Sequence, residues 1–587
     1  MSNALLTGPF SLGDVRFREP WRQAAVNVLR RPMEKMFGLR TLNELYGVAQ
    51  GLPREESFLE RSLAAMNVSY EVVAGDLAKI PAKGGCVVVS NHPFGGLDGV
   101  VLAAMLRKVR PDCKVMANFL LARVPELHEV MIFVDPFGGR EAARRNLAAI
   151  RQCLEHVKAG GMLVIFPAGE VSHVDLAKQA VEDKPWSETV ARIVRRTGAP
   201  VLPVFFGGSN GMLFNLAGMI HPALRTAMLP RELLKKRRTC VPVRIGGVIQ
   251  HRKLAGFETD KEMMSYLRLR SYILQTRPEK GAAAARETGV LSEISPAEDP
   301  RLLAEDVQGL GAEALLIENA DYAVYAARAA EIPHVLFEIG RLREKTFRGV
   351  HEGTGKAVDL DGFDQTYIHL FAWHKAKGEV VGAYRMGPTD EILPRQGVKG
   401  LYTRTCFRYG ERVLEQLGPA LELGRSFVRE EYQRCYSPLM LLWKGIGRYV
   451  HRNPRYNVLF GTVSISREYA SFSRQLIMQF LEMTSASGLA GLVKGLNPPR
   501  DRQIKPAYLK EYSHVVKDMD EVSDLVAEIE ADGKGIPILL KQYMKLSAKF
   551  LGFNIDPDFG DVLDGLMVVD LREVDPKLAE RFTGRGP

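Results

Sequence analysis

Cysteine is scarce in this chain of 587 residues, and no two cysteines form a Cys-x-x-Cys pair. The sequence therefore predicts neither a disulfide framework nor a zinc site. Several of the cysteines lie within apolar runs, which is typical of buried thiols in a reducing compartment. The cysteines are Cys86, Cys113, Cys153, Cys240, Cys406 and Cys435.

Long apolar runs are also missing. No stretch reaches the roughly 18 to 20 uninterrupted apolar residues that a membrane-spanning helix needs. The first residues, Met1 to Ala4, do not begin a signal peptide. We therefore expect a cytoplasmic protein that is at most peripheral to the membrane.

Acidic residues are outnumbered: 69 aspartates and glutamates stand against 79 lysines and arginines, which gives a net charge of +10. This excess favours an anionic partner such as nucleic acid, an acidic carrier protein or an anionic membrane face. No basic stripe with interleaved aromatic residues indicates nucleic acid. The densest basic cluster, Lys235 to Arg238, follows an apolar stretch, Gly211 to Ile220, and this combination suits the headgroup boundary of a bilayer. We therefore expect a role at an anionic membrane surface.

The length predicts two or more domains, and a hydrophobic content of 46% is ample for globular cores. In the first half, continuous Val/Ile/Leu strands alternate with helices, which predicts a largely parallel sheet covered on both faces. From about residue 312 the alternation restarts and includes a β-hairpin with a turn at 376–378. After Asn497 the pattern predicts helix and one late strand over 566–571. The expected fold class is α/β, with two domains that each have a mixed sheet covered by helices. The predicted organisation is a helical lead-in over 1–58, a first domain over 59–277, a linker over 278–311, and a second domain with a C-terminal extension over 312–587.

The most informative stretch of the chain is NHPFGGLD, residues 91–98. It follows a buried-strand pattern and precedes a helical run, so a histidine and an aspartate lie at the carboxyl end of a strand, where α/β sheets bind ligands. One turn would let Asp98 fold back onto the imidazole of His92 and fix its tautomer. The other ring nitrogen could then take a proton from an attacking hydroxyl. An isolated histidine would be better explained as a strand cap, but the neighbouring Asn91, the two glycines and Asp98 together favour catalysis.

These residues resemble the first signature of the glycerolipid acyltransferases, the family that includes lysophosphatidate acyltransferase. Three later stretches resemble its other blocks in order: IFVD at 132–135, FPAGEVS at 166–172 and VLPV at 201–204. The resemblance covers roughly residues 60–250. It implies transfer of a fatty acyl group from a thioester to a hydroxyl, without a metal or a covalent intermediate, with His92 as general base and Asp98 as its orienter. It also implies roles in binding the acceptor for Asn91, Arg140, Arg144, Gly169, Glu170 and Ser172.

The chain departs from that family at two places. Five residues separate His92 from Asp98 where the family usually has four, and the pair Gly95-Gly96 can absorb the additional residue. Ala168 stands where the family has a glutamate, and Glu170 follows two places later. This form of the third block resembles a subgroup that acylates aminoacyl lipids rather than glycerol phosphates.

Four features of the second half occur together. They are an amphipathic helix over 337–347 with Arg343, an acidic loop over 359–364, a returning strand with Arg385, and a strand with ELGRSFV at 422–428. This arrangement resembles the GNAT-type acyltransferases, and most of all the branch shared by acyl-homoserine-lactone synthases and ornithine-lipid N-acyltransferases. The resemblance covers roughly residues 312–490 and implies direct attack of an amine on an acyl thioester held over splayed strands.

An amine nucleophile is protonated at neutral pH, so the second site must remove a proton, and Glu422 could accept it directly or through water. Asp359 and Asp364 would attract a cationic side chain such as that of ornithine. Three arginines could pair with the acceptor carboxylate or with a phosphopantetheine arm. They are Arg343, Arg385 and Arg425. The alternative is that these arginines form internal ion pairs with aspartate and glutamate side chains.

No further motif indicates a nucleotide or a metal. Gly353 to Lys356 lacks the Walker spacing, and Asp359 to Asp364 does not keep the order of ligands in an EF-hand. His369 and His374 lie five residues apart on a strand and would face opposite sides. We therefore expect no metal and no cofactor, with an acyl thioester as the donor substrate.

Two acyltransfer domains in one chain predict a joint function. The second half would attach a 3-hydroxyacyl chain to the α-amine of an amino acid, and the first half would then acylate the free hydroxyl of this lyso-lipid. The order of the halves resembles that of the bifunctional ornithine lipid synthases. The expected donor and partner is acyl carrier protein, with acyl-CoA as the alternative donor, and the expected place is the cytoplasmic face of the inner membrane.

Two other interpretations stay open. One is a lysophospholipid acyltransferase that makes or remodels phospholipid, and the other is a membrane-docked protein in which one half is inactive. The amino acid also stays open between ornithine, lysine, glycine and glutamine, and the acidic loop favours a cationic one.

Overall fold

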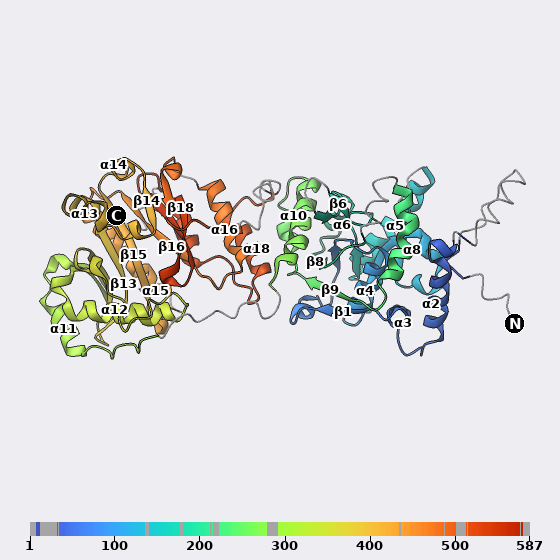
Figure 1. Ribbon diagram of the computed structural model, residues 1–587, viewed down its shortest axis with the longest axis horizontal. Coiled ribbons are helices and arrows are strands. Elements are labelled where there is room, and N and C mark those ends of the chain that lie inside the picture. The colour runs from blue at the N-terminus through green and yellow to red at the C-terminus, as the bar shows by residue number, and fades with distance from the viewer. Residues whose placement is uncertain are drawn as a thin grey trace, which may run out of the picture. The chain divides into compact units, whose positions relative to one another are not determined.

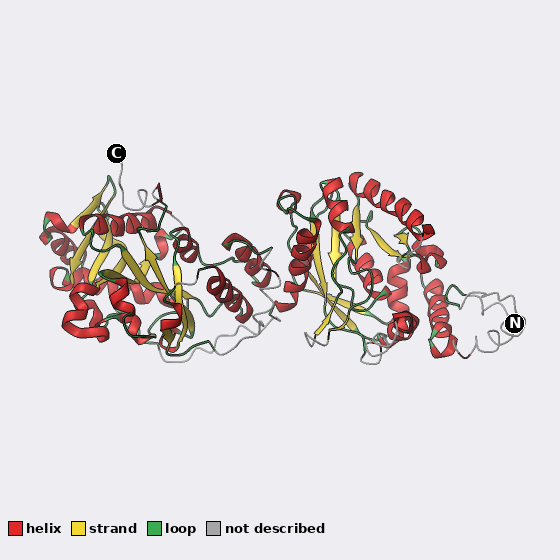
Figure 2. Cartoon of the chain, turned by 90° about the horizontal axis from the view of Figure 1, so that it is seen from above, coloured by secondary structure: helices red, strands yellow, loops and turns green. Residues whose placement is uncertain are grey.

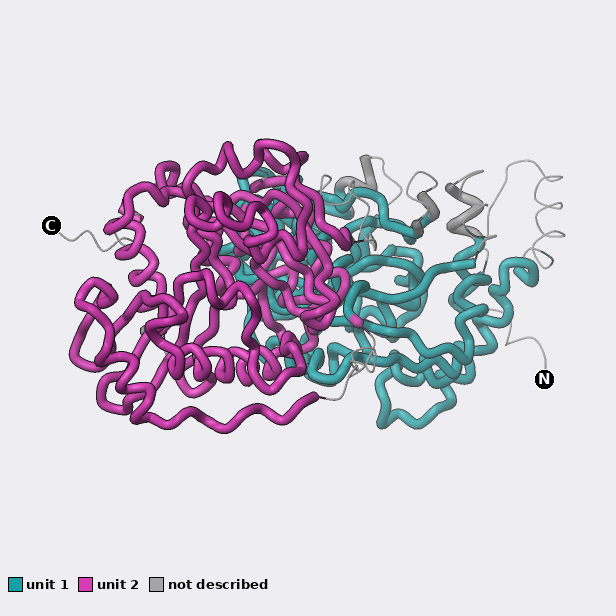
Figure 3. The backbone as a smooth tube through the Cα atoms, turned by 60° about the vertical axis from the view of Figure 1, so that its left-hand side comes forward, with its two compact units in different colours: residues 1–277, 512–517 teal, residues 278–511, 518–587 magenta. Residues whose placement is uncertain are grey.

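The computed structural model divides into two compact units, which Figure 3 draws in different colours. Unit 1 comprises residues 1–277 and 512–517, and unit 2 comprises residues 278–511 and 518–587. The structure describes residues 8–11, 32, 34–135, 140–175, 180–211, 214, 222–278, 291–433, 436–485, 488–499, 512, 515–575 and 577–578.

Unit 1 is built on a seven-stranded sheet with the order β1-β9-β8-β2-β5-β3-β4 (Figure 1). Neighbouring strands are parallel except for β8 and β9. Strand β2 is buried along its whole length between β5 and β8, so its carboxyl end, where NHPFGGLD begins, is central in the sheet. The strands are β1 Ser69–Val72, β2 Cys86–Ser90, β3 Lys114–Asn118, β4 Met131–Val134, β5 Met162–Ile165, β8 Val201–Phe206 and β9 Cys240–Ile245.

Helices cover this sheet (Figure 2). One hydrophobic core joins the buried face of α4 to valines of the central strands, such as Val88 and Val164. Helix α10 begins with a capping box, in which the Glu262 N–H donates to Thr259 Oγ1 at 3.1 Å. The helices are α2 Leu39–Gly51, α3 Phe58–Met66, α4 Gly96–Arg107, α5 Arg140–Lys158, α6 Thr189–Thr197, α8 Pro222–Lys235, α9 His251–Leu254 and α10 Asp260–Tyr272, and a small hairpin pairs β6 His173–Asp175 with β7 Ala180–Glu182.

Unit 2 is built on an eight-stranded sheet with the order β10-β11-β12-β13-β15-β16-β19-β18. Neighbours are antiparallel except for β15 and β16, which pair only from Ala420 to Glu422 although both strands continue beyond that point. The strands are β10 Leu315–Glu318, β11 Tyr322–Arg328, β12 Ile368–His374, β13 Glu379–Pro388, β15 Ala420–Val428, β16 Val458–Ile465, β18 Lys549–Asp556 and β19 Val562–Asp570, and β14 Phe407–Tyr409 pairs with β17 Val493–Gly495.

The helices of unit 2 lie around this sheet (Figure 1). Helix α12 begins with a proline at its first turn, Pro333, as expected for that position. The helices are α11 Pro300–Gly309, α12 Pro333–Arg348, α13 Thr389–Gln396, α14 Val413–Leu417, α15 Tyr436–Arg452, α16 Ser471–Thr484, α18 Met519–Ile529 and α19 Ile538–Lys545.

The predicted fold class is confirmed, since each unit has a mixed sheet covered by helices. The predicted hairpin is confirmed as β12 and β13. Two details differ. Part of the stretch expected as linker forms α11, because Asp299 caps a helix that packs on α12. The tail adds two strands, β18 and β19, where one late strand was expected. Within the described segments, no helix combines the length and apolar character needed to cross a bilayer.

Candidate active sites

The side chains of His92 and Asp98 meet at the carboxyl end of β2. His92 Nδ1 lies 3.0 Å from Asp98 Oδ2, although the two groups are not aligned as a full hydrogen bond. Asp98 Oδ2 also accepts the N–H groups of Phe94 and Gly95, at 2.9 and 3.1 Å. Gly95 has a φ of +77°, a conformation that favours glycine, and helix α4 starts at the next residue. This reversal accommodates the additional residue between His92 and Asp98.

The two side chains differ in their access to solvent. Asp98 is fully buried at the first turn of α4, whereas the His92 side chain is 18% exposed. Burial raises the pKa of Asp98, and this effect outweighs the lowering by His92 and by the two N–H groups. His92 Nε2 has no hydrogen-bond partner among the described residues. It is therefore available to exchange a proton with a ligand.

The backbone and ring of His92 are held on three sides. Its N–H donates to Asp183 Oδ1 at 3.3 Å, and its carbonyl accepts the N–H of Ser172 at 3.0 Å. Its ring stacks on Phe166, with the centroids 4.3 Å apart. Asp183 also accepts the Ser172 hydroxyl at 2.5 Å and the Trp186 indole N–H at 3.0 Å. Sequence reasoning missed Asp183, since it belongs to none of the blocks that pointed to the site.

The structure brings Ser172 to His92 but gives other predicted residues different contacts. The Asn91 amide exchanges two hydrogen bonds with the backbone of Phe206, at 2.7 and 2.9 Å, and so ties β2 to the end of β8. Glu170 forms an ion pair with Lys184. Gly169 is exposed with a φ of +67°. Arg144 is exposed on α5, and the side chain of Arg140 lies outside the described residues.

The residues of the basic cluster at 235–238 differ in their contacts. Lys235 forms an ion pair with the buried Glu232. Lys236 instead lies over the ring of Phe94, with Nζ 4.5 Å from the centroid. Most of the apolar stretch at 211–220, which was expected to accompany the cluster at a membrane, lies outside the described residues.

Unit 2 contains a buried cluster of three arginines and three aspartates. Arg343 Nη2 lies 2.9 Å from Asp364 Oδ1. Arg385 Nη1 lies 2.7 Å from Asp361 Oδ1 and 3.2 Å from Asp364 Oδ1. Arg425 completes the cluster at 3.5 Å from Asp359 and 3.7 Å from Asp361. The acidic loop and the three predicted arginines therefore contact one another.

These ion pairs leave arginine donors unused. Arg343 Nε and Nη1, Arg385 Nη2 and Arg425 Nε are buried and have no hydrogen-bond partner among the described residues. Burial alone would raise the pKa of Asp364, but Arg343 and Arg385 outweigh it and lower this pKa to about 2. A buried donor without a partner is unfavourable, so the cluster is suited to receive an additional acceptor group from a ligand.

The backbone at Arg425 is strained. Its φ is +50°, and the register between β13 and β15 shifts at this point. Such a conformation costs about 1–3 kcal/mol and persists where the surroundings enforce it. A bulge of this kind changes the direction of a side chain, and here it accompanies the contacts of Arg425 with Asp359 and Asp361.

Glu422 lies where the pairing of β15 with β16 ends, and only 2% of it is exposed. Its Oε2 accepts the Tyr367 hydroxyl and the Tyr402 N–H, the latter at 3.1 Å. Its Oε1 accepts the Thr403 N–H at 2.6 Å. Burial and the neighbouring Glu422 raise the pKa of Tyr367 well above its usual range. Glu422 is thus held in one position and keeps lone pairs that these three donors do not use.

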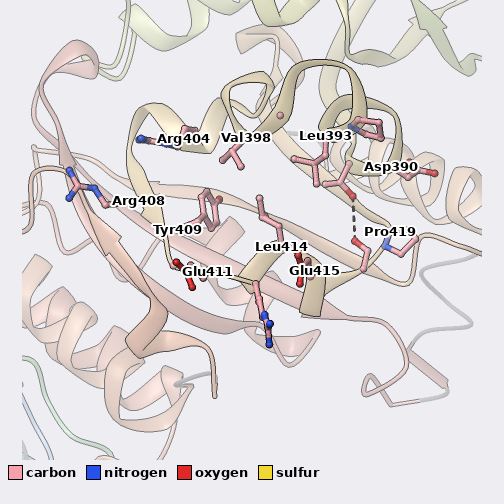
Figure 4. Close-up of a pocket in the computed structure, with 16 residues that line it drawn as sticks. Asp390, Leu393, Val398, Arg404, Arg408, Tyr409, Glu411, Leu414, Glu415 and Pro419 are labelled. Atoms are coloured by element: carbon pink, nitrogen blue, oxygen red, sulfur yellow. Dashed lines mark hydrogen bonds between the residues drawn. The ribbon is translucent and has the colours of Figure 1, made fainter.

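An open pocket of about 700 Å³ lies between α13, β14 and α14 (Figure 4), and Glu422 is not among the residues that line it. Leu393, Val398 and Leu414 give it an apolar lining. Its charged lining residues are three arginines, Arg404, Arg408 and Arg412, and three acidic residues, Asp390, Glu411 and Glu415, of which Asp390 pairs with Arg455. None of the three lining arginines forms an ion pair with a described residue. Hydrogen bonds connect one lining residue to Glu422, since the hydroxyls of Tyr409 and Thr403 lie 2.5 Å apart and the Thr403 N–H donates to Glu422.

Among the residues that the structure describes, one group has the atoms to hold a metal ion. Cys406, Asp556 and Asp564 are buried, and their ligand atoms lie within 4.8 Å of one another. The thiol contacts Asp556 Oδ2 at 3.5 Å, and the Ser464 hydroxyl donates to Asp564 at 2.8 Å. Burial raises the pKa of Asp564 to about 7. These contacts explain the group as a hydrogen-bonded junction that involves β16, β18 and β19.

Comparison with known proteins identifies both halves. Residues 25–281 match the family described as Acyltransferase, and residues 342–444 match the family described as Acetyltransferase (GNAT) domain. A glycine N(alpha)-acyltransferase of Phocaeicola vulgatus is 30% identical over 266 residues, which are 43% of this chain and 80% of that protein. A lyso-glycine lipid O-acyltransferase of the same organism is 28% identical over 200 residues, which are 32% of this chain and 67% of that protein.

Among solved structures, the 1-acyl-sn-glycerophosphate acyltransferase of Thermotoga maritima aligns with 44% of this chain and 88% of its own, at 19% identity and a TM-score of 0.26. The two family matches confirm the resemblances found in the sequence, an acyltransferase domain followed by a GNAT domain. The chain is therefore an acyltransferase, and it belongs to the family that includes the glycine N(alpha)-acyltransferases.

Proposed function

We propose that this chain makes a two-chain aminoacyl lipid in two steps. Unit 2 transfers a 3-hydroxyacyl group to the amine of an amino acid, and unit 1 then acylates the hydroxyl of that product. The observation that carries the proposal is that one chain is related both to an N-acyltransferase of an amino acid and to an O-acyltransferase of a lyso-lipid. The product of the first activity has the hydroxyl that the second requires.

In unit 1, His92 is the general base. As the hydroxyl oxygen of the acceptor attacks the thioester carbonyl, His92 Nε2 takes its proton. The C–S bond breaks, and the imidazolium returns the proton to the departing thiolate. Asp98, 3.0 Å from Nδ1, stabilises the imidazolium, and Asp183 and Ser172 keep the histidine backbone in place.

In unit 2, the amine of the amino acid attacks the thioester beside the end of the β15–β16 pairing. Glu422 takes the proton of the amine, directly or through water. The amide C–N bond forms as the C–S bond breaks, and the departing thiolate receives the proton from Glu422. The unused N–H groups of Arg343, Arg385 and Arg425 donate to the carboxylate of the amino acid or to the amide carbonyls of a phosphopantetheine arm.

Two amino acids are candidates. The acidic loop favours ornithine, whose side chain is cationic. However, Asp359, Asp361 and Asp364 all contact arginines, which compete with such a side chain. Glycine has no side chain that needs a charge partner, and the names of the relatives favour it. We propose glycine as the second candidate beside ornithine.

The proposed donor is acyl carrier protein. The pocket in Figure 4 has an apolar lining that suits an acyl chain, and its three arginines outnumber Glu411 and Glu415, the two acidic lining residues without a recorded ion pair, which favours an acidic carrier. Acyl-CoA is the alternative donor. The proposed place is an anionic membrane surface, where the lyso-lipid resides.

The test is expression in a bacterium without aminolipids, followed by mass spectrometry of the lipids. We expect a new lipid with one amide-linked 3-hydroxyacyl chain and one ester-linked chain, and its mass identifies the amino acid. His92→Ala should accumulate the single-chain lipid. Glu422→Gln, which keeps an oxygen for the Thr403 N–H, should abolish both lipids.

Two results would contradict the proposal. A two-chain lipid made by His92→Ala would remove His92 from the chemistry. Altered phospholipid chains without any aminolipid would favour the lysophospholipid acyltransferase instead.

A further inference from the structure

Unlike the other residues of the basic cluster at 235–238, Lys236 contacts the loop that carries His92, the proposed base. Its Nζ lies 4.5 Å from the centroid of the Phe94 ring and donates to the Ser209 carbonyl at 2.7 Å. Phe94 comes two residues after His92, and its own N–H donates to Asp98 at 2.9 Å. One aromatic residue therefore contacts both the buried carboxylate and the ammonium group.

The ammonium group of Lys236 has unused binding capacity. An ammonium carries three N–H donors, and only the Ser209 carbonyl accepts one of them among the described residues. Lys236 is half-buried, and this burial lowers its pKa, against the opposing effects of Glu232 and Asp98. A partly desolvated cation binds an anion more strongly than a fully hydrated one does.

We propose that Lys236 binds the carboxylate of the N-(3-hydroxyacyl) amino acid while His92 activates its hydroxyl. This inference rests on the proposed function and adds the residue that selects an acidic acceptor. In such an acceptor the hydroxyl and the carboxylate are about two residue lengths apart, roughly 7 Å. Lys236 contacts Phe94, two positions after the base, and so lies beside the loop region that such an acceptor has to span.

The neighbouring cluster residues provide a contrast. Lys235 is already paired with Glu232, and Arg237 and Arg238 are exposed. Exposed cations of this kind suit lipid headgroups in general. The contact with Phe94 places Lys236 beside the catalytic loop instead.

The experiment measures O-acylation by the full-length protein with two acceptors, an N-(3-hydroxyacyl) amino acid and its methyl ester. The wild type should prefer the free acid. Lys236→Met should lower kcat/KM for the free acid about 10- to 100-fold, mainly through KM, and leave the ester almost unchanged. Lys236→Arg should restore part of the preference. Arg237→Met is the matched control from the same cluster and should behave as the wild type.

Equal losses on both acceptors would overturn the inference. So would an equal loss in Arg237→Met, which would assign the effect to membrane charge. If the wild type acylates neither acceptor, the proposed function fails and this inference falls with it. If the wild type acylates both acceptors equally, the proposed function stands and only the role of Lys236 is wrong.

Discussion

Replacement of Asp98 by asparagine separates the charge of this residue from its structural role. The Oδ2 atom of Asp98 accepts the N–H groups of Phe94 and Gly95 and faces His92 Nδ1. The asparagine side chain should place its oxygen where Oδ2 lies, because this oxygen accepts the N–H groups of Phe94 and Gly95. The amide N–H₂ in that position would face these two donors without an acceptor. The variant therefore keeps the turn and the histidine tautomer and loses only the negative charge.

The expected loss of O-acylation is about 10³-fold. Two unit charges about 4 Å apart interact by about 4 kcal/mol at an effective dielectric constant near 20, and this stabilisation of the imidazolium disappears. General-base catalysis as a whole contributes typically 10²- to 10⁴-fold, so the estimate lies within that range.

The folding stability of Asp98→Asn should not fall with its activity. Burial raises the pKa of Asp98, so the charged carboxylate destabilises the folded state above that pKa. Asparagine removes the buried charge, and Asp98→Asn should be at least as stable as the wild type at neutral pH. Asp98→Ala should instead lose about 2–6 kcal/mol, since two buried N–H groups would lose their acceptor.

The assay measures thiol release from an acyl thioester with an N-(3-hydroxyacyl) amino acid as acceptor, together with thermal unfolding. N-acylation by unit 2 is the internal control and should stay within about twofold, since Asp98 belongs to unit 1. An Asp98→Asn variant that keeps more than a tenth of the O-acylation rate would show that the charge of Asp98 does not stabilise the imidazolium. A loss of activity that thermal unfolding traces to an unfolded protein would contradict the same role.

Two further predictions concern unit 2. Burial raises the pKa of Asp564 from 3.8 to about 7, so its contribution to stability is complete below about pH 4 and is lost as the pH rises through 7. Asp564→Asn should therefore flatten the fall in Tm between pH 5 and 8. It should also stabilise unit 2 at pH 8 by up to roughly 4 kcal/mol. Parallel curves of Tm against pH for the variant and the wild type would contradict this. Arg408→Glu combined with Arg412→Glu should raise the KM for acyl carrier protein about tenfold, and less at high salt, by reversing charge at the pocket. Equal effects on acyl-CoA would show that the pocket does not recognise the carrier.

Local sequence was enough to predict that His92, the proposed base, lies next to Asp98. His92 and Asp98 are six positions apart, with two glycines between them, so one turn joins them whatever the rest of the chain does. The same holds for β2, whose valines predict a buried strand. Short separations of this kind can be deduced because few conformations satisfy them.

The partners that hold these residues are distant in sequence. Asp183 is 91 positions from His92, and Asn91 is 115 positions from Phe206. No spacing rule connects such pairs. Likewise, the sequence offered Arg343, Arg385 and Arg425 together with the acidic loop but left open whether they meet each other or a substrate.

By itself, therefore, the amino-acid sequence determined the two acyltransferase domains and their order through short motifs that resemble known families. It also determined that His92 and Asp98 lie close together, because turn residues act over a few positions. Tertiary structure alone decided that Asp183 holds the His92 backbone, that Lys236 turns towards Phe94, and that the acidic loop pairs with three arginines. Those contacts depend on how strands and helices far apart in the chain pack, and burial then fixes which charges must meet.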